Sequence, residues 1–145
     1  RGGRNIARAA ALQHVFGCTV VNDVTARDIQ MRHSQWDLGK CIDGFCPMGP
    51  WLVTPDELAD PDDLALGCSV DGETVQDARS SDLIFGIPRL VAELSAVLPL
   101  LPGDVIFTGT PAGVGMTRQP ARSLQPGQVL DSWIEGIGTI RNHCV

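Results

Sequence analysis

The chain of 145 residues has no tyrosine, a single lysine (Lys40) and only four glutamates, of which Glu57 is the first. No apolar run approaches the ~20 residues that a membrane-spanning helix needs. With 11 basic and 17 acidic residues, the net charge of −6 argues against general binding of nucleic acid and against docking on an anionic membrane. No positively charged segment precedes an apolar one near Arg1, so we see no signal peptide and expect a soluble, cytoplasmic protein.

Several common kinds of site are also missing. The five cysteines are Cys18, Cys41, Cys46, Cys68 and Cys144, an odd number without any C-x-x-C pair. A zinc knuckle or a disulfide framework is therefore disfavoured, and we expect reduced cysteines. No G-x-S-x-G or Walker sequence occurs either, which argues against a serine hydrolase and against a P-loop nucleotide site.

What the sequence does contain predicts one domain of the α+β class, mostly β. Hydrophobic residues make up 43% of the chain, enough for a core, and 16 glycines and 10 prolines indicate many turns. The apolar patterns predict helices at 7–16, 25–31 and 88–98, and strands at 18–24, 51–54, 64–70, 74–78, 104–108, 128–134 and 139–142. Asp71-Gly72 predicts a type I′ hairpin turn, and Ser81 or Asp82 is expected to cap the next element.

Two polar residues in apolar surroundings are candidates for chemistry. Asp23 ends an apolar strand, where its carboxylate could hold a hard cation such as Mg²⁺, or could simply cap the following turn. Lys40 lies in a loop of about eighteen residues (33–50), longer than connections usually are. It is either an ordinary exposed lysine or a cation that binds an anionic keto acid and stabilises a developing oxyanion.

The glycine-rich segment 108–115 follows a predicted strand, and it is either a tight turn or a loop that lets backbone N–H groups and threonine hydroxyls approach a ligand closely.

Five blocks of this chain, in order, resemble the fumarylacetoacetate hydrolase family. They are 21–30 (VNDVTARDIQ), 39–51 (GKCIDGFCPMGPW), 76–85 (QDARSSDLIF), 108–115 (TGTPAGVG) and 135–142 (EGIGTIRN). The corresponding family blocks read NDVTARDxQ, GKSFDGFxPxGPW, QxxxTSDMIF, TGTPxGVG and EGLGTLRN. The blocks span most of the chain, and their number makes the resemblance specific.

The resemblance implies a compact mixed β-roll or β-sandwich with few short helices, usually a homodimer. It also implies an enzyme that uses Mg²⁺ or Mn²⁺ on small β-diketo or 2-oxo acids, with no nucleic-acid or membrane partner. Asp23 matches a metal-binding carboxylate, and Lys40 matches the lysine beside the metal. Arg27 and Gln30 match positions that line the substrate's oxygens, and Thr110 matches the threonine that binds the substrate carboxylate.

One departure from the family concerns the metal. The family's other two metal ligands are glutamates of an E-x-E pair upstream of the NDVTARD block, and a His-Glu acid/base pair lies earlier still. This chain has no glutamate before Glu57. We therefore expect residues 1–145 to be the C-terminal portion of one catalytic domain, N-terminally truncated. The alternative is a remnant that keeps the fold without a competent metal site.

For the complete protein the resemblance implies hydrolysis of a C–C bond in an acylpyruvate- or fumarylpyruvate-type acid, through a metal-stabilised enolate. Lys40 and Gln30 are the expected catalytic residues, and Arg27, Gln30, Lys40 and Thr110 the expected substrate-binding residues. Isomerisation or decarboxylation would use the same enolate, so the motifs do not choose among the three reactions.

Overall fold

The computed structural model describes all residues 1–145 and contains two antiparallel sheets. Strands β1 (Cys18–Val21) and β2 (Met48–Val53) pair with each other. The second sheet has the order β4-β3-β5-β6, built from β3 (Ala65–Val70), β4 (Glu73–Arg79), β5 (Val129–Ile134) and β6 (Gly138–His143). The α+β, mostly β class that the sequence predicts is confirmed.

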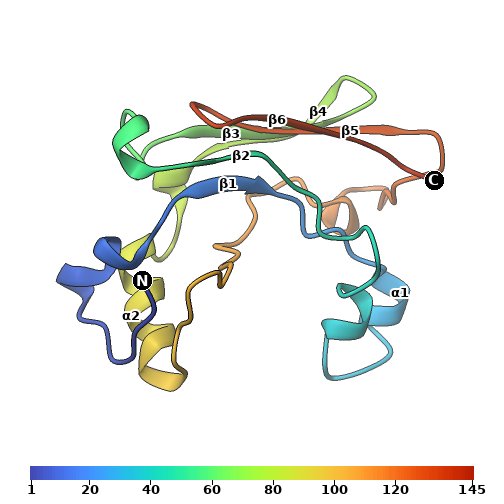
Figure 1. The fold of residues 1–145 in the computed structure, drawn as a ribbon. Coiled ribbons are helices and arrows are strands. Elements are labelled where there is room, and N and C mark those ends of the chain that lie inside the picture. Colours follow the sequence, from blue (N-terminus) through green and yellow to red (C-terminus); the bar gives the residue numbers. More distant parts are fainter.

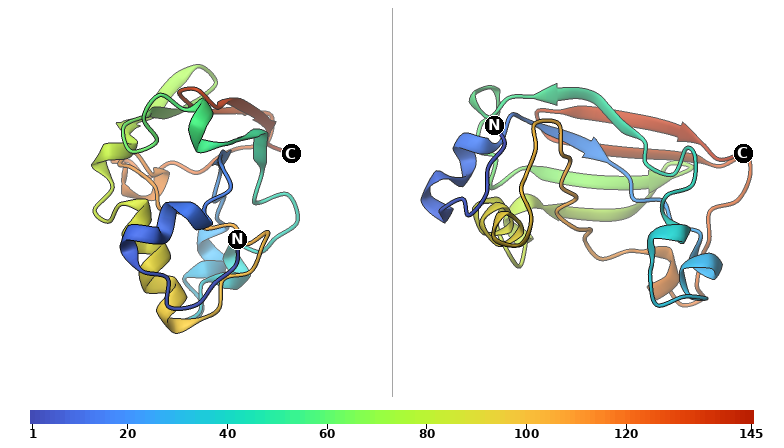
Figure 2. Two further views of the ribbon diagram at one scale, coloured as in Figure 1. Left: turned by 60° about the vertical axis from the view of Figure 1, so that its left-hand side comes forward. Right: turned by 60° about the horizontal axis from the view of Figure 1, so that its bottom comes forward.

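The helices lie below the strands, at the two ends of the molecule. Figure 1 shows α2 (Ile87–Val97) with the N-terminal segment at one end, and α1 (Arg27–Gln30) at the other. Figure 2 shows the strands of both sheets running along the length between these ends. Five 3₁₀ helices complete the fold: η1 (Arg8–His14), η2 (Asp37–Gly39), η3 (Pro55–Glu57), η4 (Ser80–Asp82) and η5 (Gly115–Thr117).

The hairpin between β3 and β4 forms as its sequence predicts. Asp71 has φ 51° and Gly72 has φ 84°, the positive values that both central residues of a type I′ turn require. The closing hairpin of β5 and β6 also matches its prediction.

Three local predictions are wrong. Residues 104–108 lie outside any strand, because no other segment of the chain hydrogen-bonds to their backbone. The predicted helix at 7–16 is the 3₁₀ helix η1 and ends at His14 with Val15 extended, so Gly17 is not its C-cap. The third prediction concerns the cap of the helix that follows. Helix α2 begins after Gly86, with Pro88 in its first turn, so neither Ser81 nor Asp82 caps it. Both residues belong to η4, where Asp82 accepts a hydrogen bond from the Arg79 backbone N–H.

The core is divided into three clusters. The largest joins the two sheets and consists of Val20, Val53, Leu58, Leu64, Ile137 and Ile140. A second, of Ile6, Ala11 and Val91, joins the N-terminal segment to α2, and a third, of Cys68, Val70 and Leu130, lies on the four-stranded sheet.

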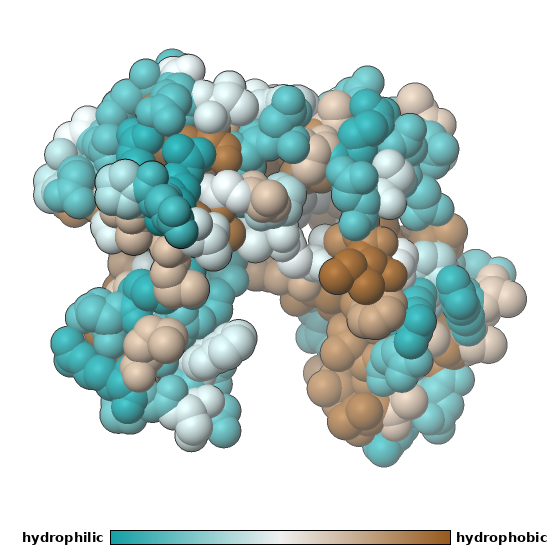
Figure 3. Space-filling model, turned by 180° about the vertical axis from the view of Figure 1, so that it is seen from behind, coloured by the Kyte–Doolittle hydropathy of each residue, from teal (hydrophilic) through white to brown (hydrophobic).

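The molecule exposes much surface for its size. A compact monomer of 15.5 kDa exposes about 7,200 Å² by the general scaling of area with mass, whereas this chain exposes 9500 Å². Figure 3 shows the open gap that separates the two ends of the molecule beneath the strands. None of its helices is long and apolar enough to cross a membrane.

The buried side chain of Ser95 links α2 to the N-terminal segment. Its fully buried hydroxyl accepts a hydrogen bond from the Ile6 backbone N–H (2.9 Å) and donates one to the Ala92 carbonyl oxygen (3.0 Å). Ser95→Ala leaves the Ile6 N–H unsatisfied, so the free energy of unfolding, measured in urea, should fall by about 1–3 kcal/mol. The exposed Ser123→Ala is the control, and an equal loss in both variants would contradict this account.

A cross-strand ion pair predicts a pH dependence. Arg141 of β6 donates two hydrogen bonds to the Asp131 carboxylate of β5, at 2.7 and 2.8 Å. These bonds hold the pKa of Asp131 below its usual value. A lowered folded-state pKa contributes stability above the unfolded-state pKa, and that stability is lost as the pH falls through the folded-state pKa. The difference in free energy of unfolding between wild type and Asp131→Asn should therefore shrink on acidification below about pH 4. A difference that stays constant from neutral to strongly acidic pH would disprove the coupling.

Candidate active site

Asp23 follows directly after β1, on a segment whose backbone is fixed by the long loop. The N–H groups of Asn22 and Val24 donate to the carbonyl oxygens of Pro47 and Phe45, each at 3.1 Å. These two bonds extend the pairing of β1 and β2 by a few residues. As a result, the backbone on both sides of Asp23 is held in place.

Lys40 reaches Asp23 because η2 packs closely against the start of α1. The Ala26 N–H donates to the Gly39 carbonyl oxygen at 2.9 Å. Gly39 is buried, and a Cβ added there would lie 2.8 Å from the Gln30 backbone nitrogen and 2.9 Å from the Ala26 carbonyl oxygen. Only glycine allows this approach, which places the next residue, Lys40, beside the segment that follows β1.

The Lys40 ammonium group forms an ion pair with the Asp23 carboxylate and also donates to the Thr25 hydroxyl oxygen at 3.3 Å. The side chains of Lys40 and Asp23 keep 28% and 43% of their surface exposed. Both groups are therefore accessible to a small ligand, while their partners fix their orientation.

Arg27 and Gln30 lie on α1, three residues apart, on the helix that carries the Gly39 contact. The Arg27 guanidinium donates to the Gln30 side-chain oxygen. Gln30 is only 3% exposed, so its amide is held rigidly, with its oxygen occupied and its nitrogen left as a donor.

Thr110 forms no hydrogen bond with Asp23, Lys40, Arg27 or Gln30. Its hydroxyl oxygen accepts a hydrogen bond from the Gln76 side-chain nitrogen of β4, at 2.9 Å. The structure thus joins Lys40 to Asp23 and Arg27 to Gln30. The Gly39 contact with Gln30 lays the two segments against each other, and β4 holds Thr110.

Two neighbours of these residues were not predicted from the sequence. Thr25 and Gln76 both belong to the blocks that resemble the family, but nothing in the sequence indicates that they contact Lys40 and Thr110. Such contacts depend on the distance between segments far apart in the chain, which the motifs do not encode.

The residues present fit one ligand position of a metal site and not a complete centre. No group of three or more histidine, cysteine, aspartate or glutamate side chains lies close enough to hold a metal ion. Asp23 is the one carboxylate in contact with Lys40. Magnesium is commonly held by one or two carboxylates together with water and substrate oxygens, so Asp23 can supply one oxygen ligand.

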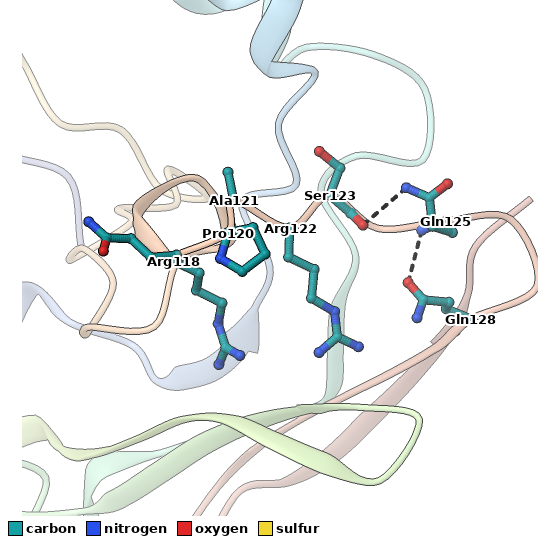
Figure 4. Close-up of a pocket in the computed structure, with 8 residues that line it drawn as sticks. Arg118, Pro120, Ala121, Arg122, Ser123, Gln125 and Gln128 are labelled. Atoms are coloured by element: carbon teal, nitrogen blue, oxygen red, sulfur yellow. Dashed lines mark hydrogen bonds between the residues drawn. The ribbon is translucent and has the colours of Figure 1, made fainter.

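Two cavities of the structure are lined by residues other than Asp23 and Lys40. One, of about 640 Å³, is polar and is lined by Arg118, Gln119, Pro120, Ala121, Arg122, Ser123, Gln125 and Gln128 (Figure 4). The other, of about 420 Å³, is an apolar groove between α2 and residues 106–107. Neither cavity is lined by a predicted site residue.

Comparison with known proteins places the chain in a family. The sequence model described as fumarylacetoacetate (FAA) hydrolase C-terminal matches residues 1–145. Oxaloacetate tautomerase YisK of Bacillus subtilis (strain 168) is 45% identical over 142 residues, covering 98% of this chain and 47% of that protein.

Solved structures agree over the whole fold. Fumarylacetoacetate hydrolase from psychrophilic Exiguobacterium antarcticum is 44% identical with a TM-score of 0.96, covering 99% of this chain and 52% of that one. Fumarylpyruvate hydrolase from Pseudomonas aeruginosa, in complex with Mn²⁺ and pyruvate, is 34% identical with a TM-score of 0.89, covering 100% and 60%. The chain thus spans about half the length of the relatives that it matches. Residues 1–145 belong to the fumarylacetoacetate hydrolase family.

Proposed function

We propose that this chain forms part of the active site of an enzyme that acts on a small 2-oxo acid and hydrolyses a C–C bond in it. The substrate would be of the acylpyruvate or fumarylpyruvate type. The observation that carries the proposal is the contact of the Lys40 ammonium group with the Asp23 carboxylate, beside the Arg27–Gln30 pair. The contact of Gly39 with Gln30 and Ala26 places these two pairs on adjacent segments of the chain.

A divalent cation, Mg²⁺ or Mn²⁺, is part of the proposal. Asp23 would provide one of its ligands. The solved relative in complex with Mn²⁺ and pyruvate supports the choice of a divalent cation. A cation bound there would act as a Lewis acid on the oxygens of the 2-oxo acid.

The remaining residues would bind and orient the substrate. Lys40 presents a compact positive charge with three donors, so it can donate to a substrate oxygen while it stays close to Asp23. Gln30 offers its amide nitrogen, because Arg27 already occupies its oxygen. Fixed donors of this kind favour negative charge that develops on oxygen during the reaction. We assign Lys40 and Gln30 the catalytic roles, and Arg27 and Thr110 the binding of substrate oxygens.

Tautomerisation of a 2-oxo acid is the second candidate. The 45% identical relative from Bacillus subtilis carries the name oxaloacetate tautomerase. Keto–enol exchange needs proton transfer alone, whereas hydrolysis needs an activated water molecule.

An assay of the full-length protein separates the two reactions. Acetylpyruvate, fumarylpyruvate and the enol form of oxaloacetate would be supplied in turn, with Mg²⁺, with Mn²⁺ and with a chelator. Hydrolysis predicts metal-dependent cleavage of an acylpyruvate, and the second candidate predicts faster ketonisation of oxaloacetate without cleavage. Metal-independent behaviour, or no turnover of any 2-oxo acid, would refute the proposal. The homodimer and the cytoplasmic location stay predictions.

Asp23→Asn tests the proposed ligand. The substitution keeps the shape and removes the charge, so affinity for Mn²⁺ and metal-dependent turnover of the full-length protein should both fall by about 100-fold or more. Calorimetric titration with Mn²⁺ and the turnover assay provide the two measurements. Asp77→Asn, on an exposed aspartate of β4, is the matched control. Undiminished Mn²⁺ affinity in Asp23→Asn would remove Asp23 from the metal site.

A further inference from the structure

The glycine-rich segment 108–115 is held mainly by side chains of other elements. No backbone–backbone hydrogen bond fixes residues 108–113. Two side chains take that role: Gln76 from β4, and Arg118 from the chain that follows the segment. We propose that Gln76 is a positioning residue that makes the Thr110 hydroxyl a hydrogen-bond donor for a substrate carboxylate. This inference rests on the proposed function.

The contacts of Gln76 determine the direction of its hydrogen bonds. Its side-chain nitrogen lies 2.9 Å from the Thr110 hydroxyl oxygen and 3.0 Å from the Pro111 carbonyl oxygen. A carbonyl oxygen only accepts, so the amide nitrogen, and not the amide oxygen, must face it. The two amide hydrogens are thus shared between Pro111 and Thr110.

The state of the Thr110 hydroxyl follows from this assignment. A threonine hydroxyl has one hydrogen to donate and two lone pairs to accept. Because Gln76 donates to the oxygen, the hydrogen of Thr110 is directed elsewhere. Thr110 is exposed, so an incoming anion can accept that hydrogen, and a carboxylate is the anion that the proposed substrate class provides.

A second set of contacts, made by Arg118, joins the segment 108–115 to β4. The Arg118 guanidinium donates to the Gly113 carbonyl oxygen (3.3 Å) and to the Val75 carbonyl oxygen (3.1 Å). Glu73 accepts hydrogen bonds from both Arg118 (3.4 Å) and Arg122 (2.6 Å). In Figure 4 the side chains of Arg118 and Arg122 extend in parallel toward the hairpin drawn in green.

The closeness of this packing explains one glycine of the segment. A Cβ at Gly113 would lie only 1.9 Å from the Val75 carbonyl oxygen, and the residue has φ 105°. Glycine alone fits there, so the backbone of the segment lies directly on β4. Gln76, the next residue of that strand, is then within reach of Thr110.

Gln76→Glu tests the direction of the hydrogen bonds with almost no change of shape. The new carboxylate repels the Pro111 carbonyl oxygen and accepts the Thr110 hydrogen, which turns the donor away from the substrate. The probe is oxalate, a dicarboxylate, titrated calorimetrically into the full-length protein in saturating Mg²⁺. We expect oxalate to bind about 10- to 100-fold more weakly, KM of a turned-over 2-oxo acid to rise more than kcat falls, and Mg²⁺ affinity to be unchanged.

A pH profile and two further variants separate positioning from simple support of the fold. Lowering the pH protonates the introduced carboxyl group, so the oxalate affinity of Gln76→Glu should recover relative to wild type. Gln76→Met removes both donors without adding charge and should weaken oxalate binding to a smaller extent. Gln13→Glu makes the same change of charge on the exposed 3₁₀ helix η1 and should leave oxalate binding unchanged.

The outcomes are distinguishable. If wild type binds oxalate and Gln76→Glu binds it equally well, the positioning role is wrong and the proposed function stands. If Gln76→Glu loses Mg²⁺ and oxalate affinity together, at every pH, Gln76 only supports the fold and the inference is also wrong. If wild type binds no oxalate in the presence of Mg²⁺, the proposed function fails and this inference fails with it.

Discussion

The ion pair between Lys40 and Asp23 depends on one close backbone approach, that of Gly39 to α1. The Ala26–Gly39 hydrogen bond and the absence of a side chain at Gly39 allow the long loop to fold back onto the segment after β1. A larger residue at Gly39 would separate the loop from α1 and carry Lys40 away from Asp23. The close packing of Gly39 on α1 is therefore a condition for the ion pair between Lys40 and Asp23.

The second part of the site follows a similar rule. Gly113 lies against the backbone of β4. The segment has no strand partner, and the side chains of Gln76 and Arg118 donate hydrogen bonds to its carbonyl oxygens. The β3–β4 hairpin thus supports Thr110, whereas β1 and α1 support Asp23 and Lys40. Two glycine contacts, that of Gly39 with α1 and that of Gly113 with β4, position the two sets of donors.

How much of this could be read from the sequence depended on the range of the interaction. The turn at Asp71-Gly72 and the paired strands β5 and β6 follow from local chemistry and were predicted correctly. The expected strand at 104–108 has the right apolar pattern, but a strand needs a neighbour to hydrogen-bond with, and no pattern within the segment reveals that none is present. Asp23, Lys40, Arg27 and Gln30 are predicted as site residues because their motifs are recognisable, and their roles stay predictions. Gln76 was not assigned a role, because its contact with Thr110 joins residues 34 positions apart.

Lys40 allows a direct test of the central claim that Asp23 and Lys40 share one cation-dependent site. In the full-length protein labelled with ¹³C only in lysine, the Cε signal that disappears in Lys40→Arg belongs to Lys40. If Asp23 binds a divalent cation, paramagnetic Mn²⁺ should broaden this signal in wild type, Mg²⁺ should not, and Asp23→Asn should abolish the broadening. A Lys40 signal that stays sharp with Mn²⁺, or that broadens equally in Asp23→Asn, would contradict the account.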